Sequence, residues 1–256
     1  MTDLELAERA AREAGEVLLG YYGREPEGLS SKTSVTDPVS EADRHAERTI
    51  RELLSAERPD DGVIGEEGSR VDAASGRHWI VDPLDGTVNF LYGMRDWCVS
   101  VALEDAEGLA VGVVFNPVSG ECFNAERGAG ATLDGRPIEV SGCRELRRAM
   151  VATGFSYDAA KRAVQAEILV ELLPRIRDLR RAGAAALDLA YTAAGRVDAY
   201  YERDLKRWDE AAGILLVREA GGLVEDLPGE PHGIIATGTP EVRDDLLPRV
   251  SRPLVG

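Results

Sequence analysis

The sequence has few of the residues that build soft-metal sites and disulfide frameworks. Among its 256 residues are three cysteines and three histidines. The cysteines are odd in number and widely spaced, so neither a disulfide framework nor a thiolate zinc site is expected. The histidines lack the HExxH spacing of zinc proteases, and we interpret them as surface or core residues.

Basic residues are outnumbered by acidic ones, and long apolar runs are missing. The 30 basic residues face 46 acidic ones, a formal net charge of −16, which disfavours nucleic acid or an anionic membrane as a partner. No apolar run approaches the roughly 20 residues of a membrane-spanning helix, and the acidic N-terminus is unlike a signal peptide. We therefore expect a soluble cytoplasmic protein, in which an anionic substrate needs a local positive charge such as a metal ion.

The apolar residues that are present indicate a mixed α/β protein. Helical spacing extends over residues 4–21 and 40–57, and residues 94–140 have the alternation and turns of an antiparallel meander. From residue 149 strands and helices alternate, which predicts a sheet between helices. We expect two sub-lobes, residues 1–145 and 146–256, with no linker that makes them independent.

Residues 78–90, HWIVDPLDGTVNF, combine a short apolar strand with two acids and a hydroxyl. The strand is expected to end at Asp82, because Pro83 offers no ladder donor. Two carboxylates about 4 Å apart repel each other by roughly 4 kcal/mol at an effective dielectric constant near 20. A fold that holds Asp82 and Asp85 together therefore usually supplies a cation. The alternative is that both acids only shape a turn, and this segment by itself does not decide.

Three further acids are candidates for the same site. Asp43 lies in the second predicted helix, Glu66 follows a short strand, and Asp209 is the second residue of the segment WDEAAG. Each has a local explanation as well: a capping box with Ser40, a solvated turn, and an acid favoured by the helix dipole. Carboxylate ligands without histidine or thiolate suit Mg²⁺.

Family motifs decide between these interpretations. The chain resembles the inositol monophosphatase family of Mg²⁺-dependent, lithium-sensitive phosphatases, and its pattern is most similar to bacterial inositol-1-monophosphatases of the SuhB type. The matching blocks are GEE at 65–67, WIVDPLDGTVNF at 79–90, WDEAAGILLVREAGG at 208–222, and the pair Lys32 and Asp43. The resemblance implies one catalytic unit over residues 1–256, a layered α-β-α-β-α sandwich like that of fructose-1,6-bisphosphatase, and a homodimer.

The resemblance also implies ligands for two to three Mg²⁺ ions. The first metal would be held by Glu66, Asp82 and the Leu84 carbonyl. The second would be held by Asp82, Asp85 and Asp209. Glu66 would also help to position a third metal through water, which makes it a catalytic residue as well as a ligand.

Further residues are assigned by the same resemblance to water activation and substrate binding. Asp43 and Thr87 would orient and activate the attacking water, with the Thr87 hydroxyl donating to Asp43. Asp85 and the amides of Gly86 and Thr87 would contact the substrate. Gly183, Ala185 and Glu202 would form its wall, and Lys32 would lie on a loop near the metals. Whether Phe155 or Ser156 faces the substrate is open.

The expected activity is hydrolysis of a myo-inositol monophosphate to myo-inositol and phosphate by in-line attack of water. Phosphoryl transfer of this kind needs positioning and charge neutralisation, not a covalent nucleophile. The alternatives are a broader sugar phosphatase acting on fructose 1,6-bisphosphate, or a bisphosphate nucleotidase, with Arg180 and Arg181 as candidate contacts for a second phosphate. A partner protein of the transcription machinery is a third possibility.

Overall fold

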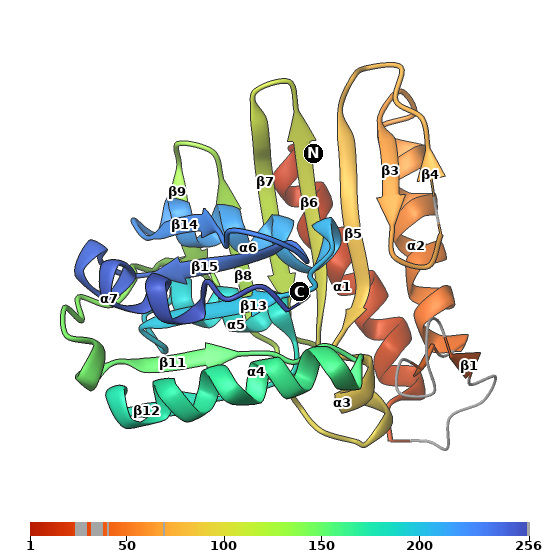
Figure 1. The fold of residues 1–256 in the computed structure, drawn as a ribbon. Coiled ribbons are helices and arrows are strands. Elements are labelled where there is room, and N and C mark those ends of the chain that lie inside the picture. Colours follow the sequence, from red (N-terminus) through yellow and green to blue (C-terminus); the bar gives the residue numbers. More distant parts are fainter. Residues whose placement is uncertain (24–29, 32–37, 40, 69, 255–256) are drawn as a thin grey trace.

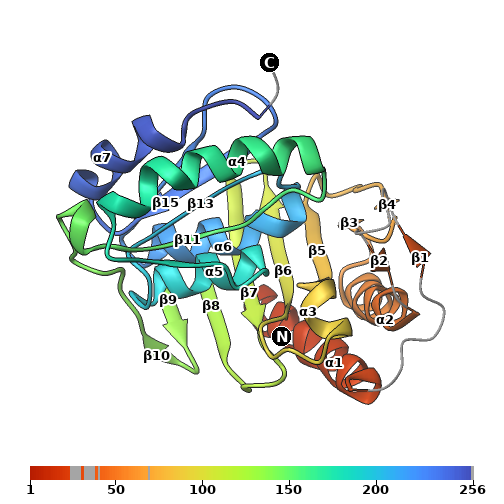
Figure 2. The same ribbon diagram turned by 60° about the horizontal axis from the view of Figure 1, so that its bottom comes forward.

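Two β-sheets alternate with three layers of helices in the computed structural model of the chain (Figures 1 and 2). The structure describes residues 1–23, 30–31, 38–39, 41–68 and 70–254. Within them the helices are α1 (Asp3–Tyr21), α2 (Glu41–Glu57), α3 (Thr87–Leu91), α4 (Ala159–Leu172), α5 (Ala185–Ala193), α6 (Arg207–Glu219) and α7 (Pro240–Val250). Two single-turn 3₁₀ helices are η1 (Leu146–Arg148) and η2 (Leu173–Arg175).

The larger sheet has eight strands in the order β10-β9-β8-β7-β6-β5-β3-β4. These are β3 (Gly62–Gly65), β4 (Arg70–Val71), β5 (His78–Asp85), β6 (Cys98–Asp105), β7 (Gly108–Phe115), β8 (Cys122–Glu126), β9 (Gly130–Leu133) and β10 (Arg136–Pro137). Strands β5 to β10 pair antiparallel in sequence order, and β3 pairs parallel with β5. The predicted antiparallel meander is confirmed.

The smaller sheet has five strands in the order β12-β11-β13-β15-β14. These are β11 (Met150–Thr153), β12 (Asp178–Arg180), β13 (Ala199–Arg203), β14 (Leu223–Asp226) and β15 (Gly233–Thr237). The short strands β1 (Ser30–Ser31) and β2 (Pro38–Val39) pair with each other, apart from both sheets.

The five layers are held together by three apolar clusters. One joins α1 and α2 to the outer face of the larger sheet, and another joins α4 and α7 to the outer face of the smaller sheet. The largest cluster surrounds α5 and α6, which lie between the sheets (Figure 2). Small residues permit this close packing: a Cβ at Gly112 of β7 would lie 2.8 Å from the Ala212 carbonyl oxygen of α6. The predicted α-β-α-β-α sandwich is thereby confirmed, while the division near residue 145 stays a prediction.

Strand β5 differs from the expectation at its carboxyl end. It continues to Asp85 instead of ending at Asp82, and its register with β6 shifts between these two acids. Asp82 is opposite Ser100 and Asp85 is opposite Cys98, so three residue steps on β5 match two on β6. The extra residue lies between Asp82 and Asp85, a stretch that includes Pro83, which cannot donate to the ladder, and the pairing resumes at Asp85.

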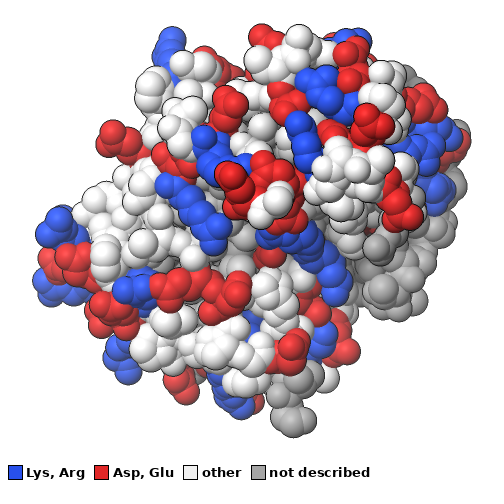
Figure 3. All heavy atoms as spheres, turned by 90° about the horizontal axis from the view of Figure 1, so that it is seen from above, with Lys and Arg blue, Asp and Glu red and all other residues white. Residues whose placement is uncertain are grey.

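The surface carries both signs of charge. Seen from above, acidic and basic side chains are interspersed over the face drawn in Figure 3. Among the helices that the structure describes, none is long and apolar enough to cross a membrane.

Candidate active site

The turn after β5 forms the centre of the site. The Leu84 amide donates to Asp82 Oδ1 at 3.0 Å, which fixes this carboxylate against its own backbone. Gly86 follows at φ 90°, and a Cβ there would lie 2.9 Å from the Asp96 carbonyl oxygen. Only glycine suits both the left-handed backbone and the close approach. The chain then enters the short helix α3 at Thr87.

Asp85 links the two sheets through helix α5. The N-cap residue of α5, Ala184, has no side chain that can bond the free amides of the first turn. The Ala186 amide donates instead to Asp85 Oδ2 at 2.7 Å. An acid about 100 residues earlier in the chain therefore caps this helix, and the Cys98 thiol contacts the same oxygen at 3.6 Å.

The pKa of Asp82 is shifted by the charges of the other predicted ligands. Asp82 is 2 % exposed. Burial raises its pKa well above the usual range, and the charges of Glu66, Asp85, Asp209 and Asp43 raise it further, in that order. Carboxylates that interact this strongly lie near one another, although they come from α2, the turn after β3, β5 and α6.

Asp85 and Asp209 respond in the same way. Burial raises the pKa of Asp85 to about 6, against the Ala186 hydrogen bond, which lowers it. Burial and then the charge of Glu66 raise the pKa of Asp209 well above its usual range. Asp209 Oδ2 also accepts from the Lys206 amide at 2.7 Å, so its local explanation at the start of α6 holds as well.

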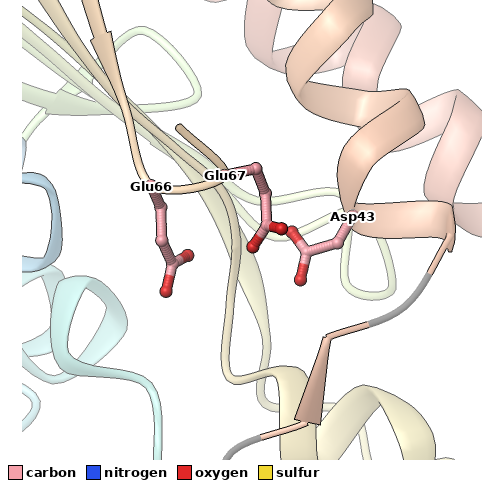
Figure 4. A group of neighbouring side chains, drawn as sticks. All are labelled: Asp43, Glu66 and Glu67. Atoms are coloured by element: carbon pink, nitrogen blue, oxygen red, sulfur yellow. The ribbon is translucent and has the colours of Figure 1, made fainter. Parts of the chain in front are cut away.

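A second group of acids lies beside this centre. Asp43 of α2 and Glu66 and Glu67 of the turn after β3 each offer an oxygen, and these oxygens lie within 4.8 Å of one another. In Figure 4 the carboxylates of Asp43 and Glu67 face each other, while Glu66 extends from the same turn on the other side. In the sequence Glu67 stands out only as part of the GEE motif, so its place in this cluster could not be predicted from it.

Glu47 supports the turn that carries Glu66 and Glu67. Its Oε2 accepts from the Glu67 amide at 2.7 Å, and its side chain is almost fully buried. A Cβ at Gly65 would lie 2.3 Å from the same oxygen, so the glycine makes room for the carboxylate. Glu47 was not predicted as a site residue, and the signal for it in the sequence is its position one helical turn after Asp43.

These side chains fit divalent metal ions. Several carboxylates are buried together and raise one another's pKa, a costly arrangement that a cation offsets. The donors are hard oxygens, which suit Mg²⁺. The hydroxyl of Thr87, which is buried, donates to the Leu84 carbonyl oxygen at 3.1 Å, the oxygen that the family resemblance assigns to the first metal. The Thr87 hydroxyl thus has Leu84 as its acceptor, and the expected hydrogen bond from Thr87 to Asp43 stays a prediction.

The predicted substrate wall comes from the smaller sheet and α5. Gly183 precedes α5 with φ +94°, Ala185 is the first residue of α5, and Glu202 lies on β13. Asn89 of α3 ties this wall to the centre, because its Nδ2 donates to the Ala182 carbonyl at 2.8 Å. Asn89 was not singled out from the sequence, since its partner is distant in the chain.

Phe155 and Ser156 have different environments. The Ser156 hydroxyl donates to Asp204 Oδ2 at 2.7 Å, and the side chain is buried. Phe155 is partly exposed, and the Arg181 guanidinium lies 5.8 Å from its ring centre. Arg181 also approaches Gly183. Of the two, Phe155 is therefore next to the wall. Lys32 and Ser40 lie outside the described residues.

Comparison with known proteins agrees with this geometry. A model of the inositol monophosphatase family matches residues 2–251. The chain belongs to the inositol monophosphatase family. It is 42% identical to an inositol-1-monophosphatase of Rhizobium meliloti, covering 98% of this chain and 97% of the relative. It is 45% identical to a Nus factor SuhB of Xylella fastidiosa, covering 86% and 80%.

Solved structures of similar proteins superpose closely on this chain. The extragenic suppressor protein SuhB of Bartonella henselae superposes with a TM-score of 0.89 at 41% identity, over 96% of each chain. An IMPase of Thermotoga maritima superposes with a TM-score of 0.88 at 33% identity, over 98% of this chain and 97% of that one. Members of the inositol monophosphatase family are metal-dependent phosphomonoester hydrolases, and the acidic cluster described above is consistent with that chemistry.

Proposed function

We propose that this protein is a Mg²⁺-dependent phosphatase that hydrolyses myo-inositol monophosphates to myo-inositol and phosphate. The observation that carries the proposal is the convergence of Asp43, Glu66, Asp85 and Asp209 on the buried carboxylate of Asp82. An assembly of acids at the end of a strand, in a chain of this family, suits an anionic ester only when cations are bound.

The metal ligands in this proposal are those of the family pattern. Glu66, Asp82 and the Leu84 carbonyl would hold one Mg²⁺, and Asp82, Asp85 and Asp209 would hold another; Glu66 would also help to position a third through water. Bound Mg²⁺ neutralises the phosphate charge and lowers the pKa of water. Glu67 is a further candidate ligand, because its oxygen belongs to the same cluster as those of Asp43 and Glu66.

The chain's own residues position the reactants. Asp43 is fully buried and accepts a hydrogen bond from the attacking water. The Thr87 hydroxyl donates to Leu84, which leaves its lone pairs to accept from the same water. The amides of Gly86 and Thr87 contact phosphate oxygens, and Asp85, Gly183, Ala185 and Glu202 contact the substrate.

The surroundings of Arg180 and Arg181 give little support for a second phosphate on the substrate. Arg180 pairs with Asp178 at 2.6 Å at the outer edge of the smaller sheet. Arg181 lies near the wall: burial raises the pKa of Glu202 and of Asp188, and the charge of Arg181 partly opposes this rise. Because its neighbours there are acids, we favour a monophosphate over fructose 1,6-bisphosphate or a bisphosphate nucleotide. A comparison of initial rates tests this, and a strong preference for the bisphosphate would overturn the substrate assignment.

The direct test is phosphate release from inositol 1-phosphate with and without Mg²⁺. We expect turnover by the wild type that disappears on chelation, and a loss of about 100-fold or more in Asp82→Asn, because a central acidic ligand is removed. An exposed-acid variant, Glu107→Gln, serves as control and should match the wild type. Absence of wild-type turnover, or equal activity of Asp82→Asn, would contradict the proposal.

A role as a partner of the transcription machinery is the second candidate. It is supported by relatives named Nus factor SuhB, among them that of Pseudomonas aeruginosa at 43% identity. The two functions can be separated, since Asp82→Asn should abolish hydrolysis and leave a scaffold surface intact. The homodimer, the cytoplasmic location and sensitivity to lithium remain predictions from the family resemblance, and light scattering and inhibition by LiCl measure the first and the last.

A further inference from the structure

We propose that Tyr200 is a positioning residue, whose hydroxyl holds Glu202 in the orientation in which this carboxylate accepts a hydrogen bond from a substrate hydroxyl. The inference rests on the proposed phosphatase function, which it extends from the reacting phosphate to the recognition of the leaving alcohol. The sequence motifs of the family did not single out Tyr200.

The geometry follows from strand β13. Residues two apart on a strand point to the same side of the sheet, so Tyr200 and Glu202 both face α5 and the site. The Tyr200 hydroxyl donates to Glu202 Oε2 at 2.7 Å. Tyr200 is 0 % exposed and belongs to the central apolar cluster, so its ring is held in place and its hydroxyl is a fixed donor.

The Glu202 carboxylate also packs against the backbone of Gly154, the residue that follows β11. A Cβ at this glycine would overlap both carboxylate oxygens, so the whole carboxylate rests on the glycine backbone. With Oε2 engaged by Tyr200, Oε1 is the second acceptor that the carboxylate can offer to a ligand. Without the tyrosine hydroxyl the carboxylate could rotate, and this acceptor would lose its fixed direction.

A second acidic residue, Asp188, lies close to Glu202. Asp188 of α5 is 1 % exposed, and its Oδ2 has no hydrogen-bond partner among the residues that the structure describes. Burial and then the charge of Glu202 raise its pKa, so the two carboxyl groups are neighbours. Carboxyl oxygens accept hydrogen bonds from hydroxyl donors, so Glu202 at this wall suits a substrate whose alcohol carries hydroxyl groups.

The test compares two substrates in one variant. Tyr200→Phe removes a single hydroxyl. We expect the KM for inositol 1-phosphate to rise about fivefold, in line with loss of one hydrogen bond, with kcat nearly unchanged. For 4-nitrophenyl phosphate, whose leaving group has no hydroxyl for Glu202, we expect KM and kcat within about twofold of the wild type.

Tyr201→Phe is the matched control. Tyr201 is the next residue on β13, lies on the opposite side of the strand in the outer apolar cluster, and is also buried. It should leave both KM values unchanged. An unchanged KM in Tyr200→Phe, or an equal change for both substrates, would overturn the inference while wild-type turnover still supports the proposed function. Failure of the wild type to hydrolyse inositol 1-phosphate would instead overturn the proposed function.

Discussion

Individual residues in this site have a local task and a shared one. Asp209 accepts from the Lys206 amide at the start of α6, and Asp85 accepts from the Ala186 amide at the start of α5. Both carboxylates therefore lie at the N-terminus of a helix, where the dipole favours an acid, although Asp85 itself belongs to β5. Both also interact with the other acids of the site. A local explanation of an acid therefore does not exclude a functional one.

Thr87 gives a prediction at this scale. Its buried hydroxyl donates to Leu84 and has lone pairs left for the attacking water. In Thr87→Ala we expect kcat to fall about 100-fold, a size typical of losing a group that orients a proton transfer, with KM changed less than about threefold. Steady-state kinetics on inositol 1-phosphate measure both constants.

The control for this prediction is Thr87→Ser, which keeps the hydroxyl. It should retain most of the wild-type kcat, since the hydrogen bond to Leu84 can still form. An unchanged kcat in Thr87→Ala would remove Thr87 from the water-activating group.

At the scale of elements, α2 and the turn after β3 act as one unit. Asp43 and Glu47 are one helical turn apart on α2, so they share a face of the helix. Asp43 belongs to the acidic cluster, and Glu47 holds the Glu67 amide. Helix α2 therefore both contributes an acid and positions the turn that carries two others.

We expect Glu47→Ala to weaken Mg²⁺ binding about tenfold, the usual effect of removing a partner that orients metal ligands. Glu47→Gln, which keeps an acceptor oxygen for the Glu67 amide, should lose less. Isothermal titration calorimetry with MgCl₂ measures the dissociation constant without relying on activity. Glu52→Ala, at an exposed position of the same helix, is the control. Equal Mg²⁺ affinity in Glu47→Ala and Glu52→Ala would show that the turn holds its shape without Glu47.

At the scale of the whole molecule, the buried acids make stability depend on pH and metal. The pKa of Asp85 is raised from an ordinary value of 3.8 to about 6 in the folded protein, and burial raises that of Glu202 to about 7. For each group, at pH values between its ordinary pKa and its raised pKa, the folded state binds more protons than the unfolded state. The free energy of unfolding that these groups contribute is therefore fully present below about pH 4 and decreases as pH rises through the folded pKa values.

The metal-free protein should accordingly lose stability from this source between about pH 4 and pH 7, and Mg²⁺ should restore it. We expect Mg²⁺ to raise Tm more at about pH 7.5 than at about pH 5, because fewer protons must then be displaced from the ligands. Differential scanning calorimetry with EDTA or MgCl₂ measures this. Asp82→Asn, which removes one buried charge, should show a shallower dependence. Equal Mg²⁺ effects at both pH values would contradict the prediction.

The individual helices and strands could be predicted because their signals are local, whereas the five-layer order came from the family resemblance. Helical periodicity marked α1 and α2, alternation marked β6 to β9, and strand–helix alternation marked the second sheet. The extension of β5 to Asp85 could not be predicted in this way. A proline normally ends a central strand, and here pairing with β6 resumes beyond the register shift.

The sequence by itself determined which side chains are available for chemistry: hard acids in family motifs, a hydroxyl beside them, and few soft ligands. Only the tertiary structure brought Asp209 to Asp82, because α6 lies between the two sheets and its first turn reaches the end of β5. The same holds for the hydrogen bond from α5 to Asp85. Such contacts depend on how layers stack, and stacking is set by the packing of many side chains at once, which no single segment encodes.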